Sequence, residues 1–189
     1  GHAILAFVGL LLAHISVNVL NDYHDFKSGV DLATKRTPFS GGSGTLVANP
    51  ALVGQARIIG LAGLAVTAAC GLVLLWRAGL GLLPIGGVGL AVVYFYTSAI
   101  NHQRWLCLAA PGLGFGPLMV VGTYYAVTGD WSWSVLVASL VPFFLVSNLL
   151  LLNQFPDVEA DQSVGRRHYP ITIGRKASSL IYGAFLLGA

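Results

Sequence analysis

Residues 4–20 read ILAFVGLLLAHISVNVL, a run without a single Lys, Arg, Asp or Glu, and the chain continues directly into NDYHD at residues 21–25. A helix needs about 20 predominantly apolar residues to cross the hydrocarbon core of a bilayer. A lone segment in lipid must satisfy its own backbone hydrogen bonds, which an α-helix does. This stretch therefore predicts a transmembrane helix with acidic side chains at one end.

Further apolar runs of similar length follow, and another begins near Ala177. The complete runs are Ile58–Trp76, Leu80–Ser98, Leu106–Val127 and Trp133–Leu152. The composition agrees, because 56% of the residues are hydrophobic and only 9% are charged, whereas a soluble domain has about 25% charged residues. We therefore expect an all-α, polytopic transmembrane helical bundle with about six spans.

The chain does not begin with Met, and it starts and stops inside apolar segments. We expect residues 1–189 to form a single, partial transmembrane domain taken from a longer protein. Cys70 and Cys107 are far apart and lack the spacing of a metal site, so we expect them to serve ordinary packing. The net charge of +3 is small, and the expected partners are the lipid bilayer and small molecules, with no nucleic acid.

Two long polar connections, residues 23–50 and 153–176, follow the first and fifth spans. Four crossings separate them, so both should lie on the same side of the membrane. Of the ten Lys and Arg residues, only Arg77 falls on the other side. Since basic residues concentrate on the cytoplasmic side, we expect both connections to be cytoplasmic in a protein of the cell membrane.

These two connections and the adjoining helix ends contain six of the seven acidic residues. If the first span continues as a helix, Asn18, Asn21/Asp22 and Asp25 share one face. Asn153, Asp157 and Asp161 have the spacing i, i+4 and i+8 and should share a second face. Glu159 should point elsewhere.

Carboxylates this close repel one another and favour a cation between them. Oxygen ligands without cysteine suit a hard ion such as Mg²⁺, which usually combines one or two protein carboxylates with waters and substrate phosphates. We predict four catalytic carboxylates: Asp22, Asp25, Asp157 and Asp161. The predicted metal ligands are these four together with Asn18 and Asn153.

A second set of residues is predicted to bind substrate around the metal. It comprises Asn21, Asp31, Lys35, Arg36, Tyr96, Arg104, Arg166 and Arg167. The basic members could contact phosphate oxygens or could simply determine membrane topology. The glycine-rich stretch at residues 41–44 is more readily a flexible connector than a phosphate-binding loop, because it lacks the Lys-Ser/Thr ending of a P-loop.

The two acidic stretches resemble the paired motifs of the UbiA-type intramembrane prenyltransferases. NVLNDYHDFKSGVD at residues 18–31 looks like the first motif, and NQFPDVEAD at residues 153–161, followed by GRR at 165–167 and IGR at 173–175, looks like the second. The residues of these two motifs resemble most those of the menaquinone branch of the family, and so does the stretch GPLMVVGTYY at residues 116–125. The resemblance implies a nine-helix fold, of which this chain would lack the first and last helices.

The resemblance also implies an activity. It would be the Mg²⁺-dependent transfer of a prenyl group from a polyprenyl diphosphate to an aromatic acceptor, which in this branch is 1,4-dihydroxy-2-naphthoate. Three alternatives remain open at the level of sequence. They are a UbiA-type enzyme with another acceptor, a cation- or proton-coupled transporter that uses intramembrane carboxylates, and an inactive prenyltransferase scaffold.

Overall fold

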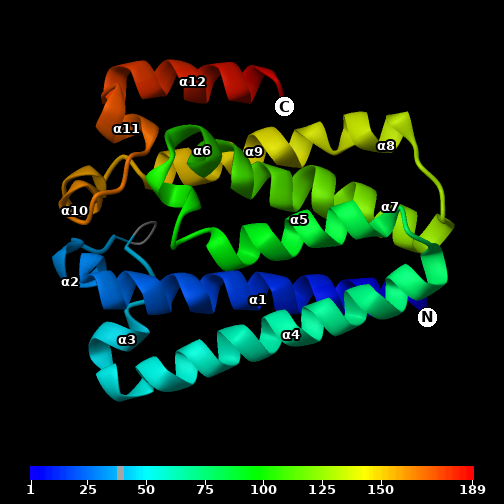
Figure 1. The fold of residues 1–189 in the computed structure, drawn as a ribbon. Coiled ribbons are helices and arrows are strands. Elements are labelled where there is room, and N and C mark those ends of the chain that lie inside the picture. The colour runs from blue at the N-terminus through cyan, green and yellow to red at the C-terminus, as the bar shows by residue number, and fades with distance from the viewer. Residues whose placement is uncertain (38–40) are drawn as a thin grey trace.

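The computed structural model describes residues 1–37 and 41–189 and shows helices joined by short turns (Figure 1). The long and medium helices are α1 (His2–Ser28), α4 (Val53–Ala78), α5 (Leu82–Phe95), α6 (Arg104–Leu113), α7 (Met119–Thr128), α9 (Leu140–Asn153) and α12 (Arg175–Leu187). The short helices are α2 (Val30–Ala33), α3 (Thr45–Ala48), α8 (Trp133–Ala138), α10 (Val158–Ser163) and α11 (Tyr169–Thr172). No strand occurs in the described ranges.

The predicted spans are found as helices. Four helical segments are long and apolar enough to cross a membrane, and α5 is a shorter apolar helix. The four segments are His2–Ser28, Pro50–Ala78, Arg104–Thr128 and Trp133–Asn153. The protein is therefore an integral membrane protein with an all-α bundle, as the composition predicts.

Helices α1 and α4 lie against each other along their length (Figure 1). A Cβ atom added at Gly60 would come within 2.7 Å of the Leu20 side chain, and one at Gly63 within 2.4 Å of the Ser16 hydroxyl. The Thr67 hydroxyl also donates a hydrogen bond across the interface to the Gly9 carbonyl, at 3.1 Å. Small residues thus allow the close backbone approach that drives helix association in lipid.

A second close contact joins the segment 104–128 to α9. Cβ atoms at Gly112 and Gly116 would lie 2.2 Å and 2.5 Å from the carbonyl oxygens of Phe143 and Ser139. Between α6 and α7 the backbone widens into a π-helical turn, Gly114–Leu118, that contains Pro117. Proline has no N–H to donate, and π-turns of this kind are a known way to absorb such a defect inside a helix.

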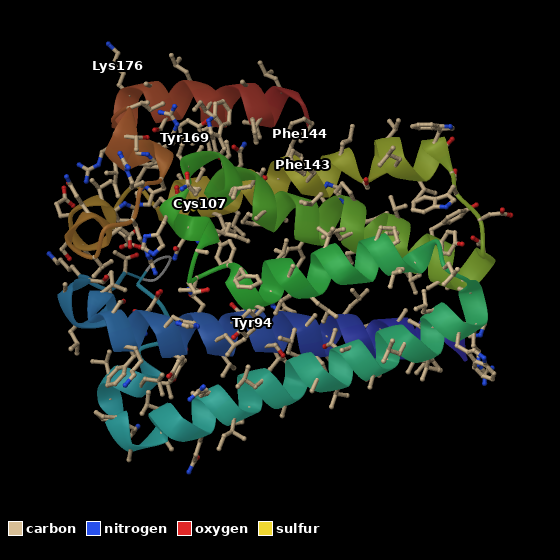
Figure 2. The ribbon with its side chains drawn as sticks, viewed as in Figure 1. Tyr94, Cys107, Phe143, Phe144, Tyr169 and Lys176 are labelled. Carbon is tan, nitrogen blue, oxygen red and sulfur yellow. The ribbon has the colours of Figure 1, made fainter. Side chains whose placement is uncertain are left out.

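Buried and exposed side chains are distributed as expected for a bundle in lipid. Ile4, Phe7, Ile58 and Leu72 each expose more than 60% of their surface. A set of small hydroxyl side chains is completely buried between helices: Ser16, Ser139, Ser147 and Ser178. Figure 2 shows Phe143 and Phe144 on the side of α9 that faces α12, where the Phe144 and Phe185 rings meet edge to face with centroids 5.2 Å apart.

The two polar connections meet at one end of the bundle, where α2, α3, α10 and α11 lie (Figure 1). We call this end, which contains Asp22, Asp25, Asp31, Asp157 and Asp161, the aspartate end. Helix α10 packs against α2 there, although the two helices are far apart in sequence. The prediction from counting crossings, that both connections lie on the same side, is therefore confirmed.

The prediction that Asn153, Asp157 and Asp161 share one face of a continuous helix is wrong. Helix α9 ends at Asn153, a turn follows, and Asp157 is the residue before α10. Pro156 explains the break, because proline lacks an N–H and disfavours helical geometry in the residue before it. The first ladder is helical as expected, since α1 continues to Ser28.

Candidate functional site

A cavity of about 430 Å³ opens at the aspartate end between the two polar connections. Nine of the predicted site residues line it: Asn18, Asn21, Asp25, Asp31, Tyr96, Asn153, Asp157, Asp161 and Arg166. Residues as far apart along the chain as Asn18 and Arg166, 148 positions, thus border one space. Its volume falls within the range of about 300–1,000 Å³ that is typical of small-molecule sites.

The last turns of α1 supply the first group of side chains. Asn21 Nδ2 donates hydrogen bonds to Asp25 Oδ2 at 3.2 Å and to Thr97 Oγ1 at 3.0 Å, the latter beyond the end of α5. Asn18 lies one turn earlier and donates from Nδ2 to the His14 carbonyl at 2.7 Å. Both Asn residues border the cavity and use their amide nitrogens as donors, and Asn21 thereby orients the Asp25 carboxylate.

Asp161 on α10 is the centre of the second group. It is 4% exposed. Its Oδ1 atom accepts a hydrogen bond from Arg166 at 2.7 Å, and its Oδ2 atom lies 2.8 Å from Nε2 of His168. Two different partners thus fix both oxygens of this carboxylate.

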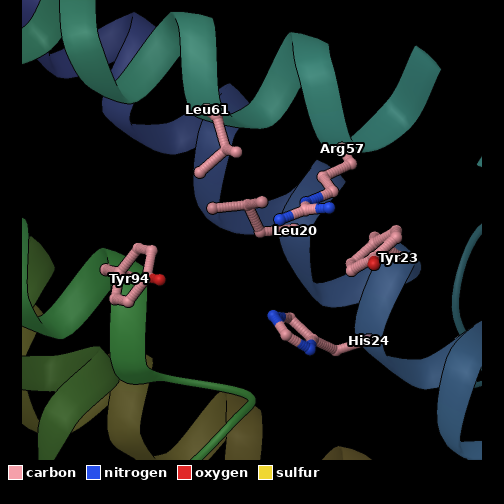
Figure 3. A pocket seen from close by; sticks show the side chains of 6 residues that line it. All are labelled: Leu20, Tyr23, His24, Arg57, Leu61 and Tyr94. Atoms are coloured by element: carbon pink, nitrogen blue, oxygen red, sulfur yellow. The ribbon is translucent and has the colours of Figure 1, made fainter. Parts of the chain in front are cut away.

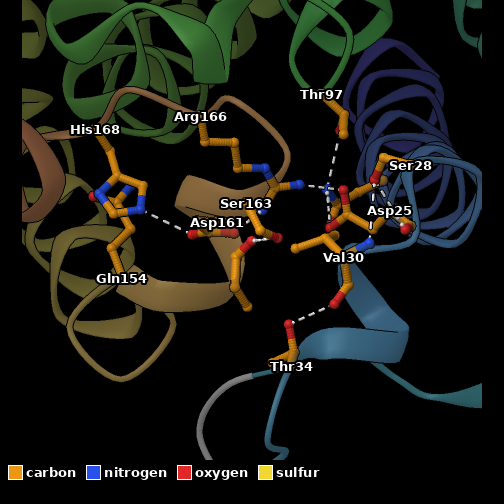
Figure 4. Close-up of polar contacts among 12 residues, drawn as sticks. Asp25, Ser28, Val30, Thr34, Thr97, Gln154, Asp161, Ser163, Arg166 and His168 are labelled. Carbon is orange, nitrogen blue, oxygen red and sulfur yellow. Dashed lines mark hydrogen bonds and ion pairs between the residues drawn. The ribbon is translucent and has the colours of Figure 1, made fainter.

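Arg166 connects the two groups (Figure 4). Its guanidinium pairs with Asp161 through one terminal nitrogen and with Asp25 through the other. The arginine side chain is 15% exposed, and the two carboxylates are 12% and 6% exposed. A guanidinium that presents two parallel donors is suited to this geometry. A positive charge therefore occupies the space between the two acidic connections.

Asp31 lies deeper in the site than its loop position suggests. It is 8% exposed on α2 and lines the cavity. Burial, together with repulsion from Asp22, raises the pKa of Asp31 to about 6, although Arg166 and Arg36 favour its ionised form. Asp22 itself is outside the cavity lining and accepts a hydrogen bond from the Ser43 hydroxyl.

The glycine-rich stretch is part of the site wall. Gly41 and Gly42 border the cavity and have φ angles of 92° and 65°, which favour glycine over residues with a side chain. A Cβ atom at Gly42 would lie 3.3 Å from an Asp31 oxygen and 3.6 Å from an Asp22 oxygen. The stretch therefore brings its backbone against two carboxylates, which a simple connector does not require.

The remaining predicted cations lie outside the cavity lining. Lys35 and Arg167 are exposed, and Arg36 donates to the Gly42 carbonyl at 2.9 Å. The Arg104 guanidinium lies over the rings of Trp105 and Tyr169, with centroids 5.9 Å away in both cases. Of the basic residues that the sequence singles out, the structure brings only Arg166 between the carboxylates.

Sequence reasoning missed several lining residues, among them Asn101, Gln154 and His168. His168 is 2% exposed, and its Nδ1 atom is buried without a hydrogen-bond partner in the described part of the chain. Gln154 donates to the sulfur of Cys107 at 3.2 Å. The sequence held no local signal for His168, because α10 ends at Ser163 and no helical spacing links the two residues.

Within residues 1–37 and 41–189, no group of three or more His, Cys, Asp or Glu side chains is arranged to hold a metal by itself. The donor chemistry nevertheless fits Mg²⁺. Carboxylate and amide oxygens border the cavity, and Asp25 and Asp161 already accept a cationic group between them. Mg²⁺ commonly takes only one or two protein carboxylates and completes its shell with water and phosphate.

Comparison with known proteins finds relatives whose names describe octaprenyl- or phytyltransferases. The chain is 26% identical over 188 residues to the 1,4-dihydroxy-2-naphthoate octaprenyltransferase of Bacillus subtilis, covering 96% of this chain and 59% of that protein. It is 26% identical over 186 residues to the corresponding Mycobacterium tuberculosis protein, covering 97% and 62%. It is 25% identical over 177 residues to the 2-carboxy-1,4-naphthoquinone phytyltransferase of Synechocystis, covering 87% and 52%.

The chain thus spans about 60% of the length of the first two of these relatives. No solved structure gives a significant match. The profile of the UbiA prenyltransferase family matches residues 1–189, which is the whole chain. Together with the helical bundle and the paired acidic motifs at one of its ends, this match leads to one conclusion: the chain belongs to the UbiA prenyltransferase family.

Proposed function

We propose that residues 1–189 form part of a membrane enzyme that transfers a prenyl group from an allylic diphosphate to an aromatic acceptor. The observation that carries this proposal is the shared cavity, in which Asp25 from the first connection and Asp161 from the second lie on either side of one guanidinium. A site that holds a cation between two carboxylates fits a substrate whose charge is a metal-bound diphosphate.

Several side chains would hold the metal. Asp25, Asp157 and Asp161 border the cavity, with the amide oxygens of Asn18 and Asn153 beside them. Asp22 is held against Ser43 at the rim, from which it could reach a bound ion through water. When bound, Mg²⁺ would neutralise the diphosphate and make it a better leaving group.

Arg166 has a second role in this scheme. Its guanidinium balances the carboxylates in the metal-free protein, and it would turn to the diphosphate oxygens when the metal binds. Electrostatic stabilisation of a leaving group is most effective when the donors are already in place. Lys35 and Arg36 lie on the connection beside the cavity and would approach the same phosphate from outside.

The transfer itself breaks the bond between the allylic carbon and the diphosphate oxygen, and the bonding electron pair leaves with the diphosphate. An electron-rich ring carbon of the acceptor then forms a bond to the allylic carbon. The ring regains aromaticity by losing a proton or, at the carboxyl-bearing carbon of a hydroxynaphthoate, by losing carbon dioxide. Tyr96 presents an aromatic ring to the cavity, and ring faces stabilise positive charge.

We infer the acceptor from the relatives, whose printed names point to naphthoate and naphthoquinone chemistry. The proposed acceptor is 1,4-dihydroxy-2-naphthoate, which would place the protein in menaquinone biosynthesis. Transport is less well supported, because transporter sites lie near the bilayer midplane at broken helices. Here the carboxylates lie at helix ends, and the π-helical turn Gly114–Leu118 contributes no residue to the cavity lining.

We also infer that the aspartate end faces the cytoplasm of a cell-membrane protein. Nine of the ten Lys and Arg residues lie at or near this end of the helices, whereas Arg77 is in the last turn of α4 at the other end. The nine are Lys27, Lys35, Arg36, Arg57, Arg104, Arg166, Arg167, Arg175 and Lys176. Basic residues concentrate on the cytoplasmic side of membrane proteins.

The proposal is tested with the full-length protein, a radiolabelled prenyl diphosphate and a panel of aromatic acceptors, with and without Mg²⁺. We expect labelled product with dihydroxynaphthoate only when Mg²⁺ is present. Asp157→Ala should abolish transfer and leave membrane insertion intact. The matched control is Glu159→Gln two residues further on, where Glu159 is 76% exposed and pairs with Arg175. Full activity of the Asp157→Ala enzyme would contradict the proposal.

A further inference from the structure

A second cavity, of about 200 Å³, lies between α1, α4 and α5 (Figure 3). Its walls are Leu20, Tyr23 and His24 from α1, Arg57 and Leu61 from α4, and Tyr94 from α5. None of these residues borders the aspartate cavity. The two spaces therefore use different residues of α1, and this one has no place in the proposed transfer reaction.

The cavity is cationic and has no acidic wall residue. Arg57 extends toward its centre (Figure 3), and no acceptor in residues 1–37 and 41–189 forms an ion pair or hydrogen bond with the guanidinium. The neighbouring carboxylates of α1 are engaged elsewhere, since Asp22 accepts from Ser43 and Asp25 pairs with Arg166. A guanidinium beside low-dielectric walls without a counter-charge favours an anionic ligand.

The remaining walls are apolar or amphipathic, and those from Leu61 and Tyr94 are exposed on the outside of the bundle. Leu61 is 37% exposed and Tyr94 is 48% exposed, and the adjacent Ile58 is 68% exposed. Such apolar exposure in a membrane bundle indicates contact with lipid. Tyr23 and Tyr94 combine a ring with a hydroxyl, the type of side chain that favours the boundary between hydrocarbon and headgroups.

We propose that this cavity binds the phosphate of an anionic membrane lipid in the leaflet at the aspartate end. Arg57 is suited to hold two phosphate oxygens, and the hydroxyls of Tyr23 and Tyr94 and the ring N–H of His24 are further donors. Leu20 and Leu61 form the floor against which the glycerol region packs. A volume of about 200 Å³ is below the range for a whole drug-sized ligand, so the acyl chains stay on the outer surface of the bundle.

The test measures lipid binding to the purified full-length protein by native mass spectrometry. The delipidated protein in detergent is titrated with phosphatidylglycerol, with phosphatidylcholine and with phosphatidylglycerol in the presence of inorganic phosphate. We expect tighter binding of phosphatidylglycerol than of phosphatidylcholine and only weak competition by millimolar inorganic phosphate. Equal binding of the two lipids would overturn the preference for an anionic headgroup, and full displacement by inorganic phosphate would overturn a lipid as the source.

Substitutions test whether phosphatidylglycerol binds in this cavity. Arg57→Gln should weaken phosphatidylglycerol binding by about tenfold, as expected for the loss of charge-assisted hydrogen bonds, and Arg57→Lys should weaken it less. The control is Lys176→Gln, which removes one positive charge from the exposed start of α12 at the same end of the bundle (Figure 2) and should change the affinity by less than about twofold. An unchanged affinity in Arg57→Gln would overturn the proposal.

The proposed lipid site and the proposed transfer reaction can be contradicted independently of each other. Asp157→Ala should lose transfer but retain phosphatidylglycerol binding, because Asp157 borders only the aspartate cavity. Thermal unfolding of each variant in the same detergent identifies folding defects. If Arg57→Gln is poorly folded, Tyr94→Phe, which removes only one donor, should still weaken binding, and an unchanged affinity there and in Arg57→Lys would overturn the proposal.

Discussion

The guanidinium of Arg166 pairs with the carboxylate of Asp25, 141 residues away in the chain. Because Arg166 also holds Asp161, this contact ties the two acidic connections together without a metal. An ion pair between buried groups is weak evidence of net stabilisation, but removing one partner leaves an uncompensated charge. In the metal-free protein, Arg166 therefore supplies the positive charge that balances Asp25 and Asp161.

Arg166→Gln should destabilise the metal-free protein. We expect a loss of about 3 kcal/mol, because two nearly buried carboxylates lose their counter-charge. Mg²⁺ should reverse part of this loss by taking the place of the guanidinium. Thermal unfolding of the full-length protein in detergent, with EDTA and with Mg²⁺, measures both effects.

The control for this variant is Arg175→Gln. It removes the pair between Arg175 and Glu159, whose side chains are 54% and 76% exposed, and exposed pairs contribute at most about 1 kcal/mol. If Arg166→Gln were no less stable than Arg175→Gln in EDTA, the bridging role of Arg166 would be wrong.

His168→Ala should weaken magnesium binding while the fold is retained. Its Nε2 atom lies 2.8 Å from an Asp161 oxygen, and partners that orient a metal-binding carboxylate typically change metal affinity by about tenfold or more. His168→Gln, which can still donate to Asp161, should recover part of the affinity. The Mg²⁺ concentration that gives half of the maximal thermal stabilisation provides a readout that does not depend on turnover. Equal midpoints for His168→Ala and the wild type would exclude this positioning role.

The site should bind magnesium less well in acid. The pKa of Asp31 is raised from 3.8 to about 6, so below this pH the cavity loses one of the negative charges that attract a cation. In the metal-free protein the raised pKa favours folding fully below pH 3.8, and this contribution is lost as the pH rises through about 6. Mg²⁺ should therefore stabilise the protein more at pH 7.5 than at pH 5.5. Asp31→Asn should flatten this difference, and a pH dependence identical to that of the wild type would count against Asp31 as its source.

Gly42→Ala should disturb the carboxylate cluster. The φ angle of 65° is unfavourable for alanine by roughly 1–2 kcal/mol, and the new Cβ atom would lie 3.3 Å from an Asp31 oxygen. We expect lower thermal stability together with a higher Mg²⁺ midpoint. Gly86→Ala on α5 is the matched control, because a Cβ atom there meets nothing within 4 Å. If both variants behaved like the wild type, the glycine-rich stretch would be only a connector.

The sequence predicts the bundle and the meeting of the two connections well, because both follow from strong rules. Apolar runs long enough to cross lipid must be helical, and the number of crossings places residues 23–50 and 153–176 on one side. The face of α1 that carries Asn18, Asn21 and Asp25 follows from the continuation of this helix to Ser28. The break before α10 was also predictable in principle, since Pro156 stands between Asn153 and Asp157.

Other features depend on tertiary packing and have no local signal. Arg166 and Arg167 are neighbours with the same chemistry, yet only Arg166 turns into the cavity. Which of the two does so depends on how the loop after α10 packs against α1. His168 stands at the start of α11, and its buried ring meets Asp161 of α10. Asp31 becomes part of the site because α2 packs against α10.

The central claim is that one metal–diphosphate unit is shared by the two acidic connections. It is tested most directly by the binding of Mn²⁺, as a substitute for Mg²⁺, to the full-length protein with an unreactive prenyl thiodiphosphate, measured by electron paramagnetic resonance. We predict that Asp25→Asn and Asp157→Asn each weaken analogue-dependent Mn²⁺ binding by tenfold or more, on the order of one lost ligand. Wild-type binding in either variant would contradict a shared site.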